Sequence, residues 1–262
     1  GAGFYILPFS FVMSFLILIL HDGRPVALRV TCTFLTAALV GSLVQLVGGS
    51  FDAPEGWEVV TALWDGGISG TAQAAVIAAG ELTEKYPARK IVTIDTYAAS
   101  LGEGLQVLEA ARMIEEGTGL DEIKAHLLSR RPHMCQFFTV DDLAYLKRGG
   151  RISSATALIG TVLSIKPILC GDETGHIVSC GKVRGMKRAY QELANYYDGR
   201  VLDKSEMLGI AHADNEEGAQ ALIALLRDKG FTGECLNVVY EPVTGAHVGP
   251  GTVALFFYGT EK

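Results

Sequence analysis

A glycine-rich turn in the first third of the chain has the residue types to bind an anion. The segment Gly66–Thr71 reads GGISGT and precedes an alanine-rich stretch that predicts a helix. The backbone N–H groups of Gly66 and Gly67 and the hydroxyl of Ser69 would then lie at a helix N-terminus, where negative charge is favoured. A glycine turn before a helix is also common without any ligand, and the spacing is not that of a P-loop. The residues alone leave both interpretations open.

A second candidate site combines cations with glycines. The segment Leu146–Ser153 reads LKRGGRIS and places Lys147, Arg148 and Arg151 around a glycine pair. A guanidinium such as that of Arg151 can bind a carboxylate or a phosphate through two parallel hydrogen bonds. The alternative is a solvated basic helix end that interacts with its own helix dipole.

Two histidines stand in segments that could carry chemistry. His247 lies in GAHVGPG, where so much backbone freedom indicates a ring held against another group, although a structural histidine is the alternative. His212 and Asp214 in IAHAD follow a predicted strand. Two side chains do not make a metal site, and no third ligand has a spacing that ties it to them, so we expect no metal.

Composition disfavours several classes of protein. The chain has 262 residues, of which 49% are apolar, so it can bury a large core and is not a disordered protein. Its net charge of -7 and its pI of about 5.4 disfavour a nucleic-acid-binding protein. The five cysteines are scattered without a C-x-x-C pair, so we expect reduced, mostly buried thiols in a cytoplasmic protein. GGISG also lacks the spacing of the G-x-S-x-G elbow of esterases.

The segment 4–50 leaves two interpretations. Asp22, Arg24 and Arg29 are the only charged residues in the first fifty. The apolar runs between them predict either buried strands and a helix, or contact with a membrane. We favour the buried elements, because polar residues dilute these runs and no basic cluster flanks them. No basic residue precedes the first run, so a signal peptide is not expected either.

From Glu58 onward the sequence alternates strand, glycine turn and helix. Helices are expected over 71–85 and 105–116, and a strand ends at Asp95. This alternation predicts βαβ units and a parallel sheet, whose ligands bind outside the carboxyl ends of the strands. The glycine turn and the loop after Asp95 would therefore lie at the mouth of a site.

The second half of the chain has a different pattern. GDETG between two strand-like runs predicts a hairpin, and a helix is expected to begin at Ser153. We therefore predict an α/β protein of two domains. Residues 1–136 would form an α/β/α domain with a parallel sheet, and residues 137–262 an α/β domain with a mixed sheet.

Several motifs in one order resemble the DegV family of bacterial fatty-acid-binding proteins. They are LAYLKRGGRIS, SIKPIL with a G-x-I hairpin, GKVRGMKRA, IAHAD and G-x-H-x-GPG, all between Glu58 and Phe257. The resemblance implies a two-domain DegV-like fold, related to the substrate domain of dihydroxyacetone kinase. It also implies that one long-chain fatty acid is buried in an interdomain tunnel.

The resemblance also implies roles for single residues. Arg151 and His247 would contact or orient the carboxylate, the turn formed by Gly66, Gly67 and Ser69 would surround it, and Arg184 would lie on a surface that docks a kinase. The better-studied relatives are the binding subunit of bacterial fatty acid kinase, which presents the carboxylate for acyl phosphate formation. The chain would then be a carrier and not an enzyme, with the bound fatty acid as its ligand and no cofactor.

The alternative is a phosphotransferase, or another phosphate-ligand enzyme related to dihydroxyacetone kinase, with GGISGT and KRGGR as phosphate cradles. The energetics of burial favour the carrier. At about 0.8 kcal/mol per methylene, a sixteen-carbon tail could contribute up to about 12 kcal/mol. The polar residues would then need only to keep the carboxylate from being buried unpaired, and Arg151 is the best candidate for this.

Overall fold

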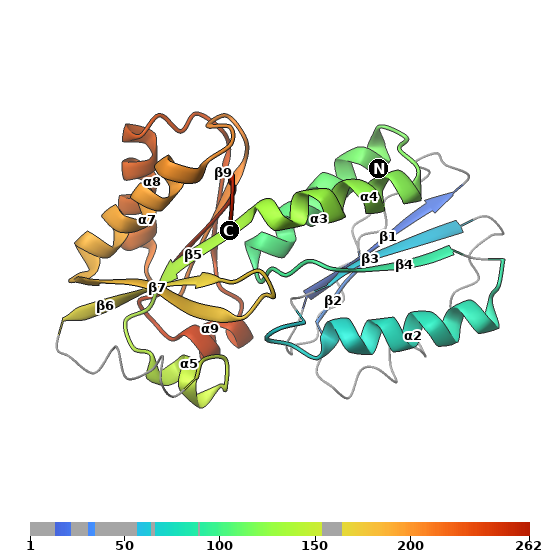
Figure 1. The fold of residues 1–262 in the computed structure, drawn as a ribbon, viewed down its shortest axis with the longest axis horizontal. Helices are drawn as coiled ribbons and strands as arrows, with labels where there is room; N and C mark the ends of the chain where they lie inside the picture. The colour runs from blue at the N-terminus through green and yellow to red at the C-terminus, as the bar shows by residue number, and fades with distance from the viewer. Residues whose placement is uncertain (1–13, 22–30, 35–56, 64–65, 89, 154–163) are drawn as a thin grey trace. The chain divides into compact units, whose positions relative to one another are not determined.

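A four-stranded sheet lies in the N-terminal half of the chain. The computed structural model describes residues 14–21, 31–34, 57–63, 66–88, 90–153 and 164–262. The strands of this sheet are β1 (Ser14–His21), β2 (Thr31–Phe34), β3 (Trp57–Leu63) and β4 (Lys90–Asp95), in the order β2-β1-β3-β4 (Figure 1).

This sheet is mixed, where a parallel sheet was predicted. β3 and β4 do pair in parallel, with α2 (Thr71–Lys85) between them in the sequence. β1, however, pairs antiparallel with both β2 and β3. The parallel prediction was based on the strand–helix alternation that begins at Glu58, and the sequence before Glu58 carries no such alternation.

Only part of the apolar segment 4–50 can be assigned. Its described residues form the strands β1 and β2, and the rest of the segment lies outside the described residues. Within the described part of the chain, every helix is too short or too polar to cross a membrane.

Helices cover both faces of the first sheet. α2 lies on one face, while α3 (Leu101–Glu115) and α4 (Leu120–Arg130) lie on the other (Figure 1). Every second residue of β4 is buried, so Val92 and Ile94 point to the same face. There they pack against apolar residues of α3 and α4, namely Ala110, Ile114, Leu120, Ile123 and Leu127.

A six-stranded mixed sheet forms the centre of the C-terminal half, as predicted. Its order is β7-β6-β5-β10-β8-β9, and only β8 and β9 pair in parallel. The strands are β5 (Met134–Thr139), β6 (Ile165–Gly171), β7 (Ile177–Arg184), β8 (Leu208–His212), β9 (Cys235–Val239) and β10 (Val253–Tyr258).

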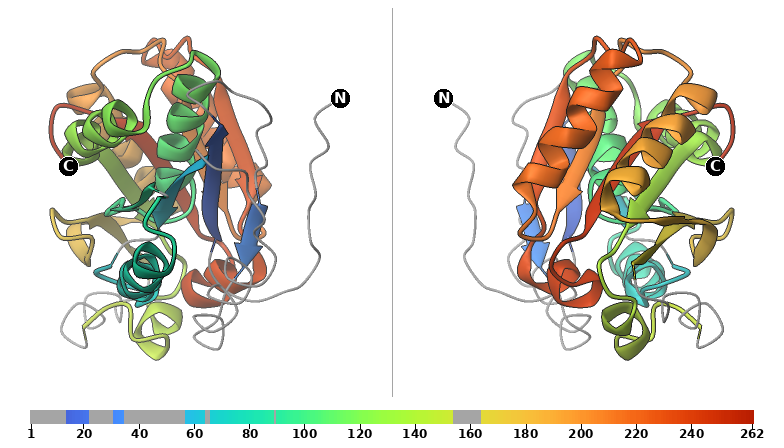
Figure 2. Two further views of the ribbon diagram at one scale, coloured as in Figure 1. Left: turned by 90° about the vertical axis from the view of Figure 1, so that its right-hand side faces the viewer. Right: turned by 90° about the vertical axis from the view of Figure 1, so that its left-hand side faces the viewer.

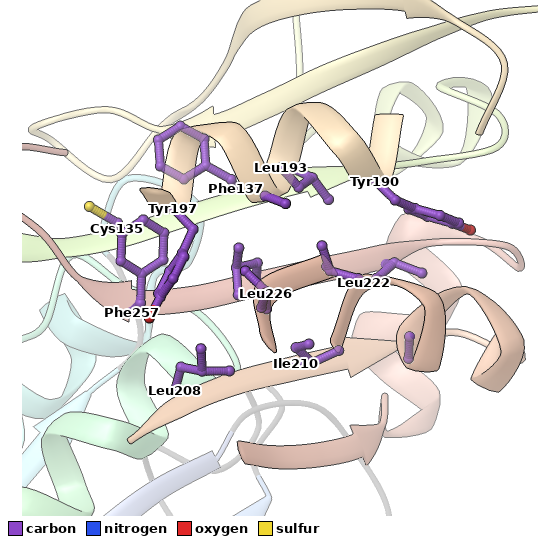
Figure 3. Close-up of a cluster of buried hydrophobic side chains, with 14 of the residues drawn as sticks. Cys135, Phe137, Tyr190, Leu193, Tyr197, Leu208, Ile210, Leu222, Leu226 and Phe257 are labelled. Carbon is purple, nitrogen blue, oxygen red and sulfur yellow. The ribbon is translucent and has the colours of Figure 1, made fainter. Parts of the chain in front are cut away.

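The larger core lies between this sheet and two long helices. α7 (Met186–Arg200) and α8 (Glu216–Asp228) lie side by side (Figure 2). Figure 3 shows Leu193 and Tyr197 of α7 with Leu222 and Leu226 of α8 beside residues of the strands. The ring of Tyr197 meets that of Phe257 edge-on, with 5.1 Å between the ring centroids.

A smaller core lies on the opposite face of the same sheet. Ile168 belongs to the larger core and its neighbour Leu169 to the smaller one, because successive strand residues point to opposite faces. Leu146 of α5 (Ala144–Arg148) and Val248 of α9 (Pro242–Val248) complete this smaller core. α9 was not among the predicted elements, and the helix expected from Ser153 lies outside the described residues.

The described chain divides into two compact units. The first holds the described residues up to Ala99 together with Gln106–Arg131, and the second holds Ser100–Leu105 and Pro132–Lys262. The boundary predicted between residues 136 and 137 falls inside β5, whose first residues pair with β10 of the second unit.

Candidate functional site

The glycine turn of the first unit lies beside the carboxylate of Asp95. β3 and β4 are in register with Leu63 opposite Asp95, so the turn after β3 and the end of β4 lie at one edge of the sheet. The N–H of Gly66 donates to both carboxylate oxygens of Asp95, at 3.1 and 3.2 Å. A Cβ at residue 66 would overlap this carboxylate, which explains the glycine there. The Gly66 N–H, which was expected to face a ligand anion, therefore already donates to Asp95.

An arginine from a distant segment completes this cluster. Arg131 donates from Nη1 to the carbonyl oxygen of Asp95 at 3.0 Å, and its Cζ lies 4.0 Å from the centroid of the Tyr97 ring. The N–H of Tyr97 donates to Asp95 Oδ1 at 3.2 Å. Ser69 is buried in the neighbouring turn, and Gly67 is half-buried. Sequence reasoning noticed the loop after Asp95 but not Arg131, which no local signal connects to this strand end.

In the second unit, the structure brings Arg151 and His247 together. Arg151 donates from Nη1 to the carbonyl oxygen of Gly149 at 2.5 Å. Gly149 lies directly against the imidazole of His247, so that a Cβ at residue 149 would overlap Nδ1. Both side chains are half-buried. Two groups from segments far apart in the sequence thus share one location, as the family resemblance implied.

The charges around His247 favour its neutral form. Burial lowers the pKa of His247 below its ordinary value, and the positive charge of Arg151 lowers it further. The negative charge of Glu241 acts in the opposite direction and is the smallest of the three effects. An anion placed beside the two side chains would compensate the guanidinium and stabilise the imidazolium.

Helix α9 fixes the position of His247 by its two ends. At its start the Glu241 carboxylate accepts a hydrogen bond from the N–H of Thr244 at 2.8 Å. At its end Gly249 has φ 79°, and a Cβ there would lie 2.5 Å from Cδ2 of Tyr145 in α5. Thr252 Oγ1 donates to the carbonyl oxygens of Val248 and Gly249 at 3.0 and 2.9 Å. The glycines around His247 therefore end a helix and let it approach α5.

The remaining candidates lie elsewhere in the second unit. Arg184 is exposed at the end of β7, next to Gly185 with φ 83°. His212 is buried, accepts the N–H of Asn215 at Nδ1 (3.1 Å), and lies 2.7 Å from Glu216 at Nε2. It thus supports the start of α8. Over the described residues, no three His, Cys, Asp or Glu side chains are grouped as metal ligands.

Comparison with known proteins identifies the family. The sequence model described as "Uncharacterised protein, DegV family" matches residues 51–260. A DegV domain-containing protein of Clostridium perfringens is 39% identical over 209 residues, which is 79% of this chain and 72% of that protein. The chain belongs to the DegV family. Residues 1–50 lie outside the family match.

Solved structures of DegV proteins share the fold. The structure titled "Fatty Acid Binding of a DegV family Protein from Thermus thermophilus" has a TM-score of 0.73 at 28% identity, covering 95% of this chain and 91% of that one. A structure of DegV from Bacillus subtilis, described as a fatty acid binding protein, has a TM-score of 0.69 at 30% identity, covering 87% and 78%. The predicted α/β DegV-like fold is thereby confirmed.

Proposed function

We propose that this chain is a carrier that binds one long-chain fatty acid and performs no reaction on it by itself. Arg151 and His247 would hold the carboxylate. The observation that carries the proposal is the meeting of these two side chains over Gly149, because a carboxylate there would accept from the guanidinium and pair with the imidazolium. The Thermus thermophilus and Bacillus subtilis relatives, which are described as binding fatty acids, support the same class of ligand.

The role proposed for the glycine turn is secondary. Gly66 already donates to Asp95, and a second carboxylate at that N–H would meet the Asp95 charge. Gly67 and Ser69 would line the polar end of the site without carrying its charge. The same negative charge disfavours a phosphate at this turn, and therefore disfavours the phosphotransferase alternative. The position of the acyl tunnel between the two domains stays a prediction.

The partner we propose is a fatty acid kinase that phosphorylates the bound carboxylate. The motif resemblance implies that Arg184 lies on the docking surface, and its exposure at the end of β7 is consistent with that role. Binding and docking would then depend on different arginines.

Variants of these two arginines test this division. Arg151→Ala should weaken binding of labelled palmitate or oleate by roughly tenfold or more, since a hydrogen bond to a charged group contributes about 1.5–3 kcal/mol. Arg151→Lys should recover only part of the affinity, because lysine keeps the charge and loses the fork. Arg184→Ala should bind normally and impair acyl phosphate formation with the partner kinase.

Arg148→Ala is the matched control for loss of a nearby positive charge. Arg148 is exposed, and its Cζ lies 4.7 Å from the centroid of the Tyr145 ring. Its affinity should stay within about twofold of the unaltered chain, as expected for exposed charges. Unchanged binding in Arg151→Ala, or lost binding in Arg184→Ala, would contradict the assigned roles. Binding of ATP or a sugar phosphate by calorimetry, without binding of fatty acid, would favour the phosphotransferase.

A further inference from the structure

The hairpin of β6 and β7 brings two cysteine side chains onto one face. The strands run antiparallel with Cys170 opposite Val178, and the register shifts by one residue between Ile168 and Leu169. Cys180 is the extra residue at this shift, because Ser179 pairs with Leu169 and Gly181 with Ile168. Both cysteines pack against the larger core beside α7. The two thiols therefore lie diagonally opposite each other across the hairpin.

Both thiols are half-buried and held by neighbouring groups. Cys180 Sγ donates to the carbonyl oxygen of Ile168 at 3.4 Å, and the Tyr196 hydroxyl donates to the carbonyl oxygen of Cys180 at 3.0 Å. These contacts fix the bulged part of β7 against β6 and α7. Partial exposure leaves room for a small oxidant, while the paired strands keep the two sulfurs close.

The two thiols differ in reactivity. The neighbouring thiol of Cys180 lowers the pKa of Cys170 despite its burial, and the positive charge of Arg200 lowers it further, against the negative charge of Asp172. The same thiol–thiol contact and burial raise the pKa of Cys180. Because the thiolate is the attacking form, the positive charge of Arg200 favours Cys170 as the attacking sulfur.

The other thiols with described side chains are less reactive. Burial raises the pKa of Cys135 to about 12, and Cys135 Sγ donates to the carbonyl oxygen of Glu261 at 3.0 Å. Burial raises the pKa of Cys235 to about 11. Cys135 lies within electrostatic range of Cys170 and is the competing partner, whereas Cys235 serves as a control.

We propose that Cys170 and Cys180 are a redox-active pair that a hydroperoxide converts into a disulfide across the hairpin and that small thiols reduce. Cys170 sulfur attacks the terminal peroxide oxygen, the O–O bond breaks, and with hydrogen peroxide a sulfenic acid and water are formed. Cys180 sulfur then attacks the Cys170 sulfur, which releases a second water. The two thiols lose two electrons in total and the peroxide gains them. A small dithiol reverses the reaction by thiol–disulfide exchange.

Peptide mapping of the whole chain tests this pair. The reduced protein is treated with hydrogen peroxide, the remaining thiols are alkylated, and the chain is cut with trypsin and a glutamyl endopeptidase together. No Lys or Arg lies between Cys170 and Cys180, so the cut after Glu173 is needed to separate them, and the tryptic cuts after Arg148 and Arg151 separate Cys135 from Cys170. We expect the two fragments to stay joined, lighter than their sum by two hydrogen atoms, and to separate after dithiothreitol treatment.

Three variants assign the steps. Cys180→Ser should accumulate a sulfenic acid on Cys170 that dimedone traps, Cys170→Ser should lose the link, and the control Cys235→Ser should keep it. Separate fragments after oxidation, a link to Cys135, a disulfide between two chains, or a sulfinic acid on Cys170 as the main product would overturn the proposal. The linked fragments are measured on the unaltered chain, so this result does not depend on the folding of any variant.

Discussion

The imidazole of His247 is half-buried beside the guanidinium of Arg151, and burial and this charge together lower its pKa. Without a ligand it is therefore neutral at pH 7, since even an unperturbed imidazole titrates near about 6.5. A bound carboxylate would raise the pKa of His247, because it stabilises the imidazolium. The Arg151 guanidinium and the His247 imidazolium repel each other when both are charged, and a bound anion offsets this repulsion.

Binding of a fatty acid should take up a proton at His247. The pKa of the free protein is lowered and the carboxylate raises it, so affinity should increase as the pH falls from neutral through the ordinary histidine range. The free folded chain should lose stability over the same range, because its unfolded state binds the proton more readily. Titrations of a labelled fatty acid between neutral and mildly acidic pH measure this slope.

His247→Gln should flatten that dependence. His176→Gln, in the exposed turn between β6 and β7, is the control and should keep it. An affinity that falls with decreasing pH, or a slope that survives His247→Gln, would show that another group takes up the proton.

The sequence identified Arg151 and His247 one at a time. Each stands among glycines, which is a local signal that needs no fold. That the two side chains meet depends on the packing of α5 against α9, which links segments far apart in the sequence. For the same reason the bond between Gly66 and Asp95 was not predicted, although each lies at the end of a predicted strand.

Among the elements, those marked by a turn or by strand–helix alternation could be predicted, and the direction of the unmarked strand β1 could not. The pairing of β3 with β4 and the hairpin of β6 and β7 follow from short, well-marked segments. The direction of β1 does not, because an apolar run fits a strand of either direction. α9 was missed although Glu241 followed by Pro242 is a helix-start signal, because the run from Cys235 to Pro242 predicts a strand.

The end of α9 depends on Gly249. Gly249→Ala should destabilise the chain by about 2 kcal/mol or more, because alanine is strained at φ 79° and its Cβ would lie 2.5 Å from the Tyr145 ring. Gly230→Ala is the matched control. Its φ is 90°, but the nearest atom to its Cβ would be Lys204 Cδ at 3.5 Å, so it carries strain without the overlap.

Urea unfolding of both variants measures the difference. Gly249→Ala should unfold at the lower urea concentration and should also weaken fatty-acid binding, because the last turn of α9 carries His247. Equal destabilisation of the two variants would show that the Tyr145 contact does not position this helix.

At the scale of the whole molecule, the α/β class and the mixed second sheet could be predicted because they follow from patterns repeated along the chain. The division into two units could be predicted only coarsely. Residues Ser100–Leu105 belong to the second unit although they begin a helix that continues in the first. No composition shift marks this exchange, because it is set by packing such as that of Leu101 against Gly209.

The proposed function requires that the folded chain encloses a fatty acid. The most direct measurement is mass spectrometry of the organic extract of protein purified from a bacterial host and then denatured. We predict one long-chain fatty acid per chain, and a smaller amount from Arg151→Ala purified in the same way. A chain that releases no fatty acid, and that also fails to bind added palmitate or oleate, would contradict the account.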